Sequence, residues 1–201
     1  MRGLIVYGDA TLKLVEDIPM PEITPYTALV KTIACGICNG TDTKLTAGHL
    51  NGFATYPAVL GHEAVGQVIQ VGSKVSKYRV GDFVLRSGLG ETEQYHSLWG
   101  GFAEYGRVLD YEAMVADGIP ANLGDISQQV IPEGIDPVDA TMLITVKEVY
   151  SALKRLGVKK GDKVAISGCG PVGLAMVKAA KLLGASFVAL SGHHDWRIAI
   201  A

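Results

Sequence analysis

The feature that most constrains the fold of this chain is a glycine-rich loop between a strand pattern and a helix pattern. Residues 163–167 read KVAIS, a short apolar run, and residues 172–183 carry apolar side chains at helical spacing up to Gly184. A second apolar run follows within residues 186–190. Strand, helix and strand in this order predict two parallel strands joined by a right-handed crossover.

The loop itself reads GCGPVG. Gly168 and Gly170 permit a tight turn and a close backbone approach, and Gly173 lets the helix pack on the strand. The N–H groups where the helix begins, around Pro171 and Val172, are suited to receive a pyrophosphate. Such a pattern also occurs in ordinary strand-to-helix turns, but the flanking strand and helix favour a dinucleotide-binding loop.

The first half of the chain shows a different pattern. Short β-branched runs at residues 28–33, 66–71 and 82–85 are separated by glycine and proline. Their spacing predicts a compact antiparallel β barrel or sandwich. Asp136 and Pro137 then predict the start of a long helix over residues 138–156, which would link two domains.

Three side chains in this β-rich part carry groups that bind metal ions. Cys38 stands shortly before Thr41 and Asp42, and His62 and Glu63 follow in the run GHEAVG. Thiolate, imidazole and carboxylate are ligands that zinc takes, and a catalytic zinc site uses three with one position left open. Because Cys38 and His62 lie 24 residues apart, only the fold can bring them together. The alternative is a buried free cysteine and a loop histidine bonded to the backbone.

The cysteine count argues against a disulfide framework. Three cysteines cannot all pair within one chain. Cys35 and Cys38 form a CxxC without a second such pair, so we interpret Cys35 as a buried strand residue. Cys169, between two glycines, is interpreted as a spacer rather than a nucleophile.

Composition excludes several functional classes. The 201 residues are 48% hydrophobic and 19% charged, with a net charge of −2 and no run of one sign. This gives no reason to expect nucleic acid or a membrane as a partner, and favours a small neutral substrate. The N-terminus lacks a signal-peptide pattern, and the longest apolar stretch is too short to span a bilayer. A cytoplasmic protein is expected.

Metal ligands first and a nucleotide loop second is an order that resembles the zinc-type medium-chain dehydrogenases/reductases, the alcohol and polyol dehydrogenase family. The resemblance extends along the whole chain. It implies a mixed α/β fold: a GroES-like β-barrel catalytic domain at residues 1–150, followed by the start of a Rossmann domain at residues 151–201. Since a doubly wound sheet has about six strands, we expect a truncated Rossmann domain, the N-terminal part of a longer and homo-oligomeric enzyme.

The resemblance also assigns roles around the metal. Cys38 and His62 would bind one catalytic zinc ion, and Glu63 would bind it directly or act from behind a ligand. Thr41 would relay the hydroxyl proton, and Asp42 would hold the ligand loop through hydrogen bonds. In the family one residue separates the cysteine from the Ser/Thr-Asp pair. Here two residues, 39 and 40, intervene, so the role of Thr41 depends on whether its register survives this insertion.

Two further departures concern the metals. The third family ligand falls by register on Leu143 or Ile144, which cannot bind metal, and Glu148, one helical turn beyond, is a substitute. Many relatives also carry a four-cysteine lobe for a structural zinc, and residues 86–101 contain no cysteine. No structural zinc is expected.

The end of the second strand bears on the choice of nucleotide. Aligned with the family, Gly192 takes the place of the acid that binds the ribose 2′-hydroxyl in NAD enzymes. Room for a 2′-phosphate favours NADP, although Asp195 would supply the acid if the register were shifted. Residues that could donate to this phosphate are Ser191, His193 and Arg197. The adjacent pair His193-His194 could suggest a metal site, but a solvated loop is favoured.

The resemblance therefore implies a zinc-dependent alcohol dehydrogenase that oxidises a secondary alcohol or sugar alcohol reversibly, with hydride transfer to NAD(P). A zinc-independent quinone or enone reductase of the same superfamily is the alternative enzyme, and the missing third ligand speaks for it. A non-catalytic remnant that keeps the barrel is the alternative outside enzymes. Metal analysis and nucleotide binding distinguish the three.

Overall fold

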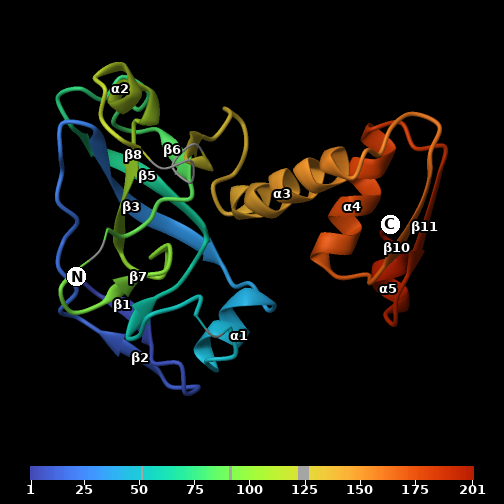
Figure 1. The fold of residues 1–201 in the computed structure, drawn as a ribbon, viewed down its shortest axis with the longest axis horizontal. Coiled ribbons are helices and arrows are strands. Elements are labelled where there is room, and N and C mark those ends of the chain that lie inside the picture. Colours follow the sequence, from blue (N-terminus) through green and yellow to red (C-terminus); the bar gives the residue numbers. More distant parts are fainter. Residues whose placement is uncertain (51, 91, 122–126) are drawn as a thin grey trace. The chain divides into compact units, whose positions relative to one another are not determined.

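The chain forms two compact units in the computed structural model, Met1–Thr141 and Met142–Ala201. The structure describes residues 1–50, 52–90, 92–121 and 127–201. The sequence placed the domain boundary at residue 150, whereas the compact units divide between Thr141 and Met142. The long helix therefore belongs to the second unit (Figure 1).

The first unit is built around a five-stranded antiparallel sheet in the order β8-β3-β5-β6-β9. Its strands include the three β-branched runs of the sequence. Their bounds are β3 (Thr27–Gly36), β5 (Glu63–Val71), β6 (Phe83–Leu85), β8 (Tyr105–Leu109) and β9 (Gln129–Val130). The longest pairing joins β3 to β5 and runs from Ala28↔Val71 to Gly36↔Glu63.

A second sheet of four strands has the order β2-β1-β4-β7. The strands are β1 (Gly3–Val6), β2 (Leu12–Val15), β4 (Ala58–Val59) and β7 (His96–Ser97). The β4–β7 pair is parallel, which the expectation of an antiparallel fold did not include. A parallel pair needs a long connection rather than a hairpin, and the chain between β4 and β7 includes both β5 and β6.

Two short helices lie at opposite ends of the first unit (Figure 1). They are α1 (Thr41–Thr46) and α2 (Tyr111–Ala116). Asp110 caps α2, because its side chain accepts a hydrogen bond from the N–H of Ala113. Apolar clusters fill the described part of the unit, and one of them joins Leu45 of α1 to Val6, Ala58 and Leu60.

The second unit has the predicted strand–helix–strand order. β10 (Lys163–Ser167) and β11 (Phe187–Ser191) are parallel and in register over five residue pairs. The helices of this unit are α3 (Met142–Arg155), α4 (Pro171–Leu182) and α5 (Asp195–Ile198). Its core joins Val149 and Leu153 of α3 to Ala179 and Ala180 of α4.

The helix α3 begins four residues later than predicted. Asp136 accepts hydrogen bonds from the N–H groups of Val138 and Asp139, and residues Asp139–Thr141 form a 3₁₀ turn before the helix. The predicted N-cap therefore caps this turn. None of the described helices is long and apolar enough to cross a bilayer.

Candidate metal centre and nucleotide loop

The β3–β5 pairing brings Cys38 and His62 to the same end of one sheet. Gly36, the last residue of β3, stands opposite Glu63, the first residue of β5. Cys38 follows β3 by two residues and His62 precedes β5 by one. Antiparallel pairing therefore closes the 24-residue separation that the sequence left open.

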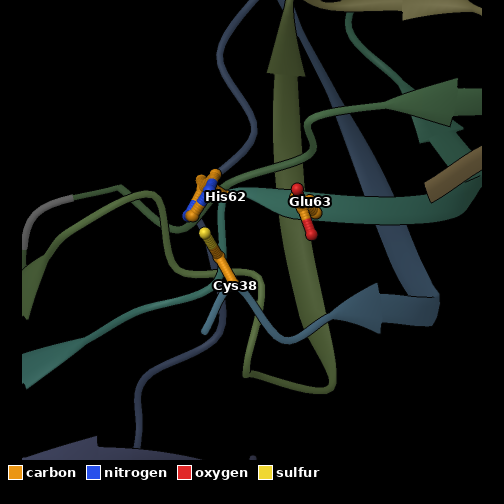
Figure 2. A group of neighbouring side chains, drawn as sticks. All are labelled: Cys38, His62 and Glu63. Atoms are coloured by element: carbon orange, nitrogen blue, oxygen red, sulfur yellow. The ribbon is translucent and has the colours of Figure 1, made fainter. Parts of the chain in front are cut away.

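Cys38, His62 and Glu63 each offer a ligand atom, and these atoms lie within 4.8 Å of one another. Figure 2 shows the sulfur of Cys38 pointing toward the imidazole of His62. His62 and Glu63 are buried, whereas Cys38 is half-buried. Sulfur, nitrogen and oxygen donors at this spacing, with one side reached by solvent, fit a four-coordinate metal ion with an open position.

Asp42 connects two of these residues from behind. Its Oδ2 accepts a 2.8 Å hydrogen bond from the N–H of Cys38, and its Oδ1 lies 3.5 Å from Nδ1 of His62. Oδ1 of Asp42 and Nδ1 of His62 are both buried, and neither makes a hydrogen bond within the described residues. A histidine that binds metal through one ring nitrogen usually turns its other N–H to a carboxylate. The position of the Asp42 carboxylate next to Nδ1 is therefore the arrangement expected if His62 binds metal through its other ring nitrogen.

The same pair also affects the pKa of the imidazole. The interaction with Asp42 raises the pKa of His62 from its usual value, although burial opposes this. The neutral ring needed for metal binding would keep its proton on Nδ1, facing the carboxylate.

The two cysteines differ in their readiness to ionise. Burial would raise the pKa of the Cys38 thiol, but the N–H groups of Thr41 and Gly40 stabilise the thiolate and the net shift is downward. Burial raises the pKa of Cys35 to about 12. Only the thiolate binds metal well, so the structure separates Cys38 from Cys35 although both belong to one CxxC.

Thr41 is the first residue of α1, and its backbone N–H donates to the sulfur of Cys38 at 3.4 Å. The one-residue insertion thus leaves the backbone of Thr41 beside the cysteine. A proton-relay role for its hydroxyl remains a prediction.

Two neighbours of the cluster were missed in the sequence. A Cβ on Gly36 would stand 2.6 Å from Oε2 of Glu63, so the carboxylate occupies space that this glycine leaves free. Trp99, with a left-handed φ of 72°, places its ring centroid 4.8 Å from that of His62. Glycine at the end of a strand was the only available signal for Gly36, and nothing pointed to Trp99.

Comparison with known proteins identifies the family. Residues 24–118 match the alcohol dehydrogenase GroES-like domain, and this segment contains all three donors of the cluster. The chain belongs to the zinc-type medium-chain dehydrogenases/reductases. The expected GroES-like fold is thereby confirmed.

Individual members of the family resemble most of this chain. An NADP-dependent isopropanol dehydrogenase from Entamoeba histolytica is 32% identical over 194 residues, which cover 92% of this chain and 52% of that protein. A probable cinnamyl alcohol dehydrogenase from Populus deltoides is 35% identical over 80% of this chain and 48% of its own length. A sorbitol dehydrogenase from Ovis aries is 30% identical over 94% of this chain and 54% of its own length.

A solved structure of a zinc-binding dehydrogenase from Sinorhizobium meliloti 1021, bound to NADP, superposes with a TM-score of 0.75 at 27% identity. It covers 98% of this chain and 57% of the other. The chain thus spans about half the length of the dehydrogenases that it matches.

In this chain, Leu143, Ile144 and Glu148 all lie on α3, in the second unit. The third donor that the first unit itself provides is Glu63.

The predicted nucleotide loop joins β10 to α4. Gly168 has a φ of 104°, which glycine adopts readily, and its N–H donates to the carbonyl of Ser191. Gly170 is the N-cap of α4 and Pro171 is its first residue. Gly173 is buried, and a Cβ there would overlap the carbonyl oxygen of Gly168. Gly168 and Gly173 therefore have separate geometric reasons, whereas a Cβ at Gly170 would meet no atom within 4 Å.

The residues expected near the adenosine lie just past β11. Ser191 ends the strand, Gly192 follows it, and His193 is exposed. The guanidinium of Arg197 stands 4.9 Å from the ring centroid of Trp196. Asp195 begins α5 and is exposed. His193 and His194 are in no group of three potential metal ligands within the described residues.

Proposed function

We propose that this chain takes part in a zinc-dependent alcohol dehydrogenase reaction, the reversible oxidation of a secondary alcohol or sugar alcohol with hydride transfer to NADP. The observation that carries the proposal is the convergence of Cys38, His62 and Glu63 within 4.8 Å, with Asp42 behind His62. The named activities of the relatives, on isopropanol and sorbitol, support the substrate class.

The cluster would hold one zinc ion through the Cys38 thiolate, the His62 imidazole and the Glu63 carboxylate. Zinc in such a site polarises the oxygen of an alcohol and makes its hydroxyl proton easier to remove near neutral pH. Asp42 fixes the orientation of His62 and the backbone of Cys38 at the same time. Thr41, beside Cys38, is the group proposed to pass the hydroxyl proton toward solvent.

The loop from Gly168 to Gly173 would hold the dinucleotide. The free N–H groups at the first turn of α4 are suited to the pyrophosphate, and Gly170 carries no side chain to obstruct it. Ser191, His193 and Arg197 are proposed to contact the 2′-phosphate, because no carboxylate stands at position 192. The alcohol would give a hydride to the bound nicotinamide and its hydroxyl proton to Thr41.

Metal content tests the central claim. The purified chain should contain about one zinc ion per molecule, and Cys38→Ala and His62→Ala should each remove it. Cys35→Ala is the matched control, because it deletes the other thiol of the CxxC and should leave the zinc in place. Retention of zinc in both ligand variants, or its loss in the control alone, would refute this ligand assignment.

A substrate panel separates the proposal from the zinc-independent reductase. That alternative is favoured by the absence of a metal-binding side chain at positions 143 and 144. The panel should include isopropanol, sorbitol, cinnamyl alcohol and a quinone. An aromatic alcohol belongs in it because Trp99 packs on His62, and Phe53 lies 5.9 Å from Trp99 between ring centroids. Quinone reduction by zinc-free protein would decide for the reductase.

A further inference from the structure

Trp99 stands in a backbone conformation that bulky side chains avoid. Its φ is 72°, and the other non-glycine residues with positive φ in the described part of the chain are Ala10 and Arg86. This left-handed region costs free energy for an L-residue and is a marked outlier for a bulky one. Such strain persists only where the surrounding structure imposes it, and it is concentrated at functional sites.

Backbone hydrogen bonds on both sides of Trp99 impose this conformation. The N–H of Leu98 donates to the carbonyl of Val59 at 2.9 Å, and the N–H of Gly101 donates to the carbonyl of Gly61 at 3.0 Å. Both acceptors belong to the segment that leads into β5. The loop that carries Trp99 is therefore fixed to the backbone just before the metal-binding histidine.

The ring of Trp99 packs on the imidazole of His62. The ring centroids are 4.8 Å apart and the ring planes are inclined by 51°, a separation and a tilt that aromatic pairs favour. On its Nδ1 side the imidazole faces Asp42 at 3.5 Å, and this buried nitrogen has no hydrogen bond within the described residues. The carboxylate alone therefore does not hold the ring, and the contact with Trp99 restrains its tilt.

We propose that Trp99 is a positioning residue for His62, whose ring keeps the imidazole in the orientation in which its other nitrogen can bind the metal ion. This inference rests on the proposed zinc-dependent function. The segment 86–101, which contains no cysteine, would then support the metal centre through an aromatic ring.

Four variants of the 201-residue chain test this role. Trp99→Gly and Trp99→Asn remove the ring, and both new residues accept a positive φ. Trp99→Phe keeps an aromatic ring at the same place. Trp196→Phe is the matched control, because it removes the other tryptophan, which is 62% exposed on α5 in the second unit.

Three measurements are made on each variant. Competition with a chelator gives the zinc affinity, and the visible absorption of the Co²⁺-substituted protein reports the geometry around the ion. Thermal unfolding of the metal-free protein shows whether the fold is retained.

Trp99→Gly and Trp99→Asn should each lower the zinc affinity about five- to tenfold and change the Co²⁺ absorption. Both should still unfold cooperatively without metal, because the new residues relieve the backbone strain. Trp99→Phe should restore most of the affinity and the parent absorption. Trp196→Phe should keep the parent values of both.

The positioning role is overturned if both ring-deleting variants bind zinc as tightly as the parent chain and keep its Co²⁺ absorption. It is also overturned if Trp99→Phe loses as much affinity as Trp99→Gly. Failure of both ring-deleting variants to fold would assign Trp99 to the core instead, which also overturns the proposal. In each of these cases the parent chain still binds zinc and the proposed function stands, whereas a parent chain without zinc would refute both.

Discussion

The two sites of this chain are assembled in opposite ways. The metal cluster consists of side chains from the ends of two strands, β3 and β5, which meet only through their long-range pairing. The nucleotide loop is a run of six consecutive residues whose geometry depends on the absence of side chains. The metal cluster should lose its ion when a donor atom moves. The nucleotide loop should lose its conformation when a side-chain atom is added at a crowded glycine.

This difference determines what a mutation should do. At the metal cluster, a change of charge or orientation should alter metal affinity while the sheet persists, because the pairing itself is backbone to backbone. At the loop, a single added methyl group should lower the stability of the fold wherever it would overlap a backbone atom. The predictions below test that contrast, from the largest expected effect to the smallest.

Gly173→Ala should destabilise the second unit by about 3 kcal/mol, because the new Cβ overlaps the carbonyl oxygen of Gly168, a backbone atom held in the loop. Gly170→Ala is the matched control: it has no atom within 4 Å of the new Cβ and an ordinary φ of −75°. It should leave the Tm nearly unchanged but weaken NADPH binding. Equal loss of stability in both variants would break the proposed division of roles within the loop.

Asp42→Asn should reduce zinc affinity about 10- to 100-fold, because the amide keeps the shape but loses the charge that orients His62. Competition with a chelator measures the affinity, and circular dichroism checks that the fold is retained. An unchanged affinity would mean that the orphaned Asp42–His62 pair has no part in metal binding.

Asp110 is a buried acid that is not proposed to act on the metal, so Asp110→Asn provides the contrast to Asp42→Asn. Its carboxylate accepts hydrogen bonds from the N–H groups of Ser76, Lys77 and Ala113, which lower its pKa although burial would raise it. We expect a loss of about 2 kcal/mol in the free energy of unfolding at pH 7, and no loss of zinc.

The sign of the pH dependence follows from the lowered pKa. The parent chain should have the larger free energy of unfolding, and its full excess over Asp110→Asn should be present above the usual carboxyl pKa of about 4. This excess should disappear as the pH falls through the lower pKa of Asp110 in the folded state. Urea unfolding of both proteins at neutral and acidic pH measures this. An advantage that grew on acidification would contradict it.

Gly36→Ala should have the smallest effect, about a fivefold loss of zinc affinity, or 1 kcal/mol. The new methyl would press on the carboxylate of Glu63 at 2.6 Å, but a side-chain end can rotate away. Gly40→Ala is the control, since its nearest contact is the sulfur of Cys38 at 3.9 Å. If the control lost as much zinc as Gly36→Ala, Glu63 would not be the reason.

Local patterns in the sequence were enough to predict the strand–helix–strand part of the second unit. The strand at residues 163–167 is β10 residue for residue, and β11 and α4 differ from the predicted ranges by one residue at each end. These elements are contiguous, and the turn between them depends on glycines whose conformational freedom is a property of the residue itself. The start of α3 was missed because Asp136 caps a 3₁₀ turn, which has the same sequence signal as a helix start.

The residue types of the metal cluster could also be read from the sequence, but not their convergence. Whether Cys38 reaches His62 depends on the register of β3 against β5, and a sequence pattern does not determine register between distant strands. Three relations appeared only in the tertiary structure: Asp42 facing His62, Gly36 beside Glu63, and Cys169 against Gly192. The sequence by itself determined which chemical groups are present, because composition and local conformation are short-range properties. The tertiary structure alone decided which of them share a space, because excluded volume and hydrogen bonding act between residues that only folding brings together.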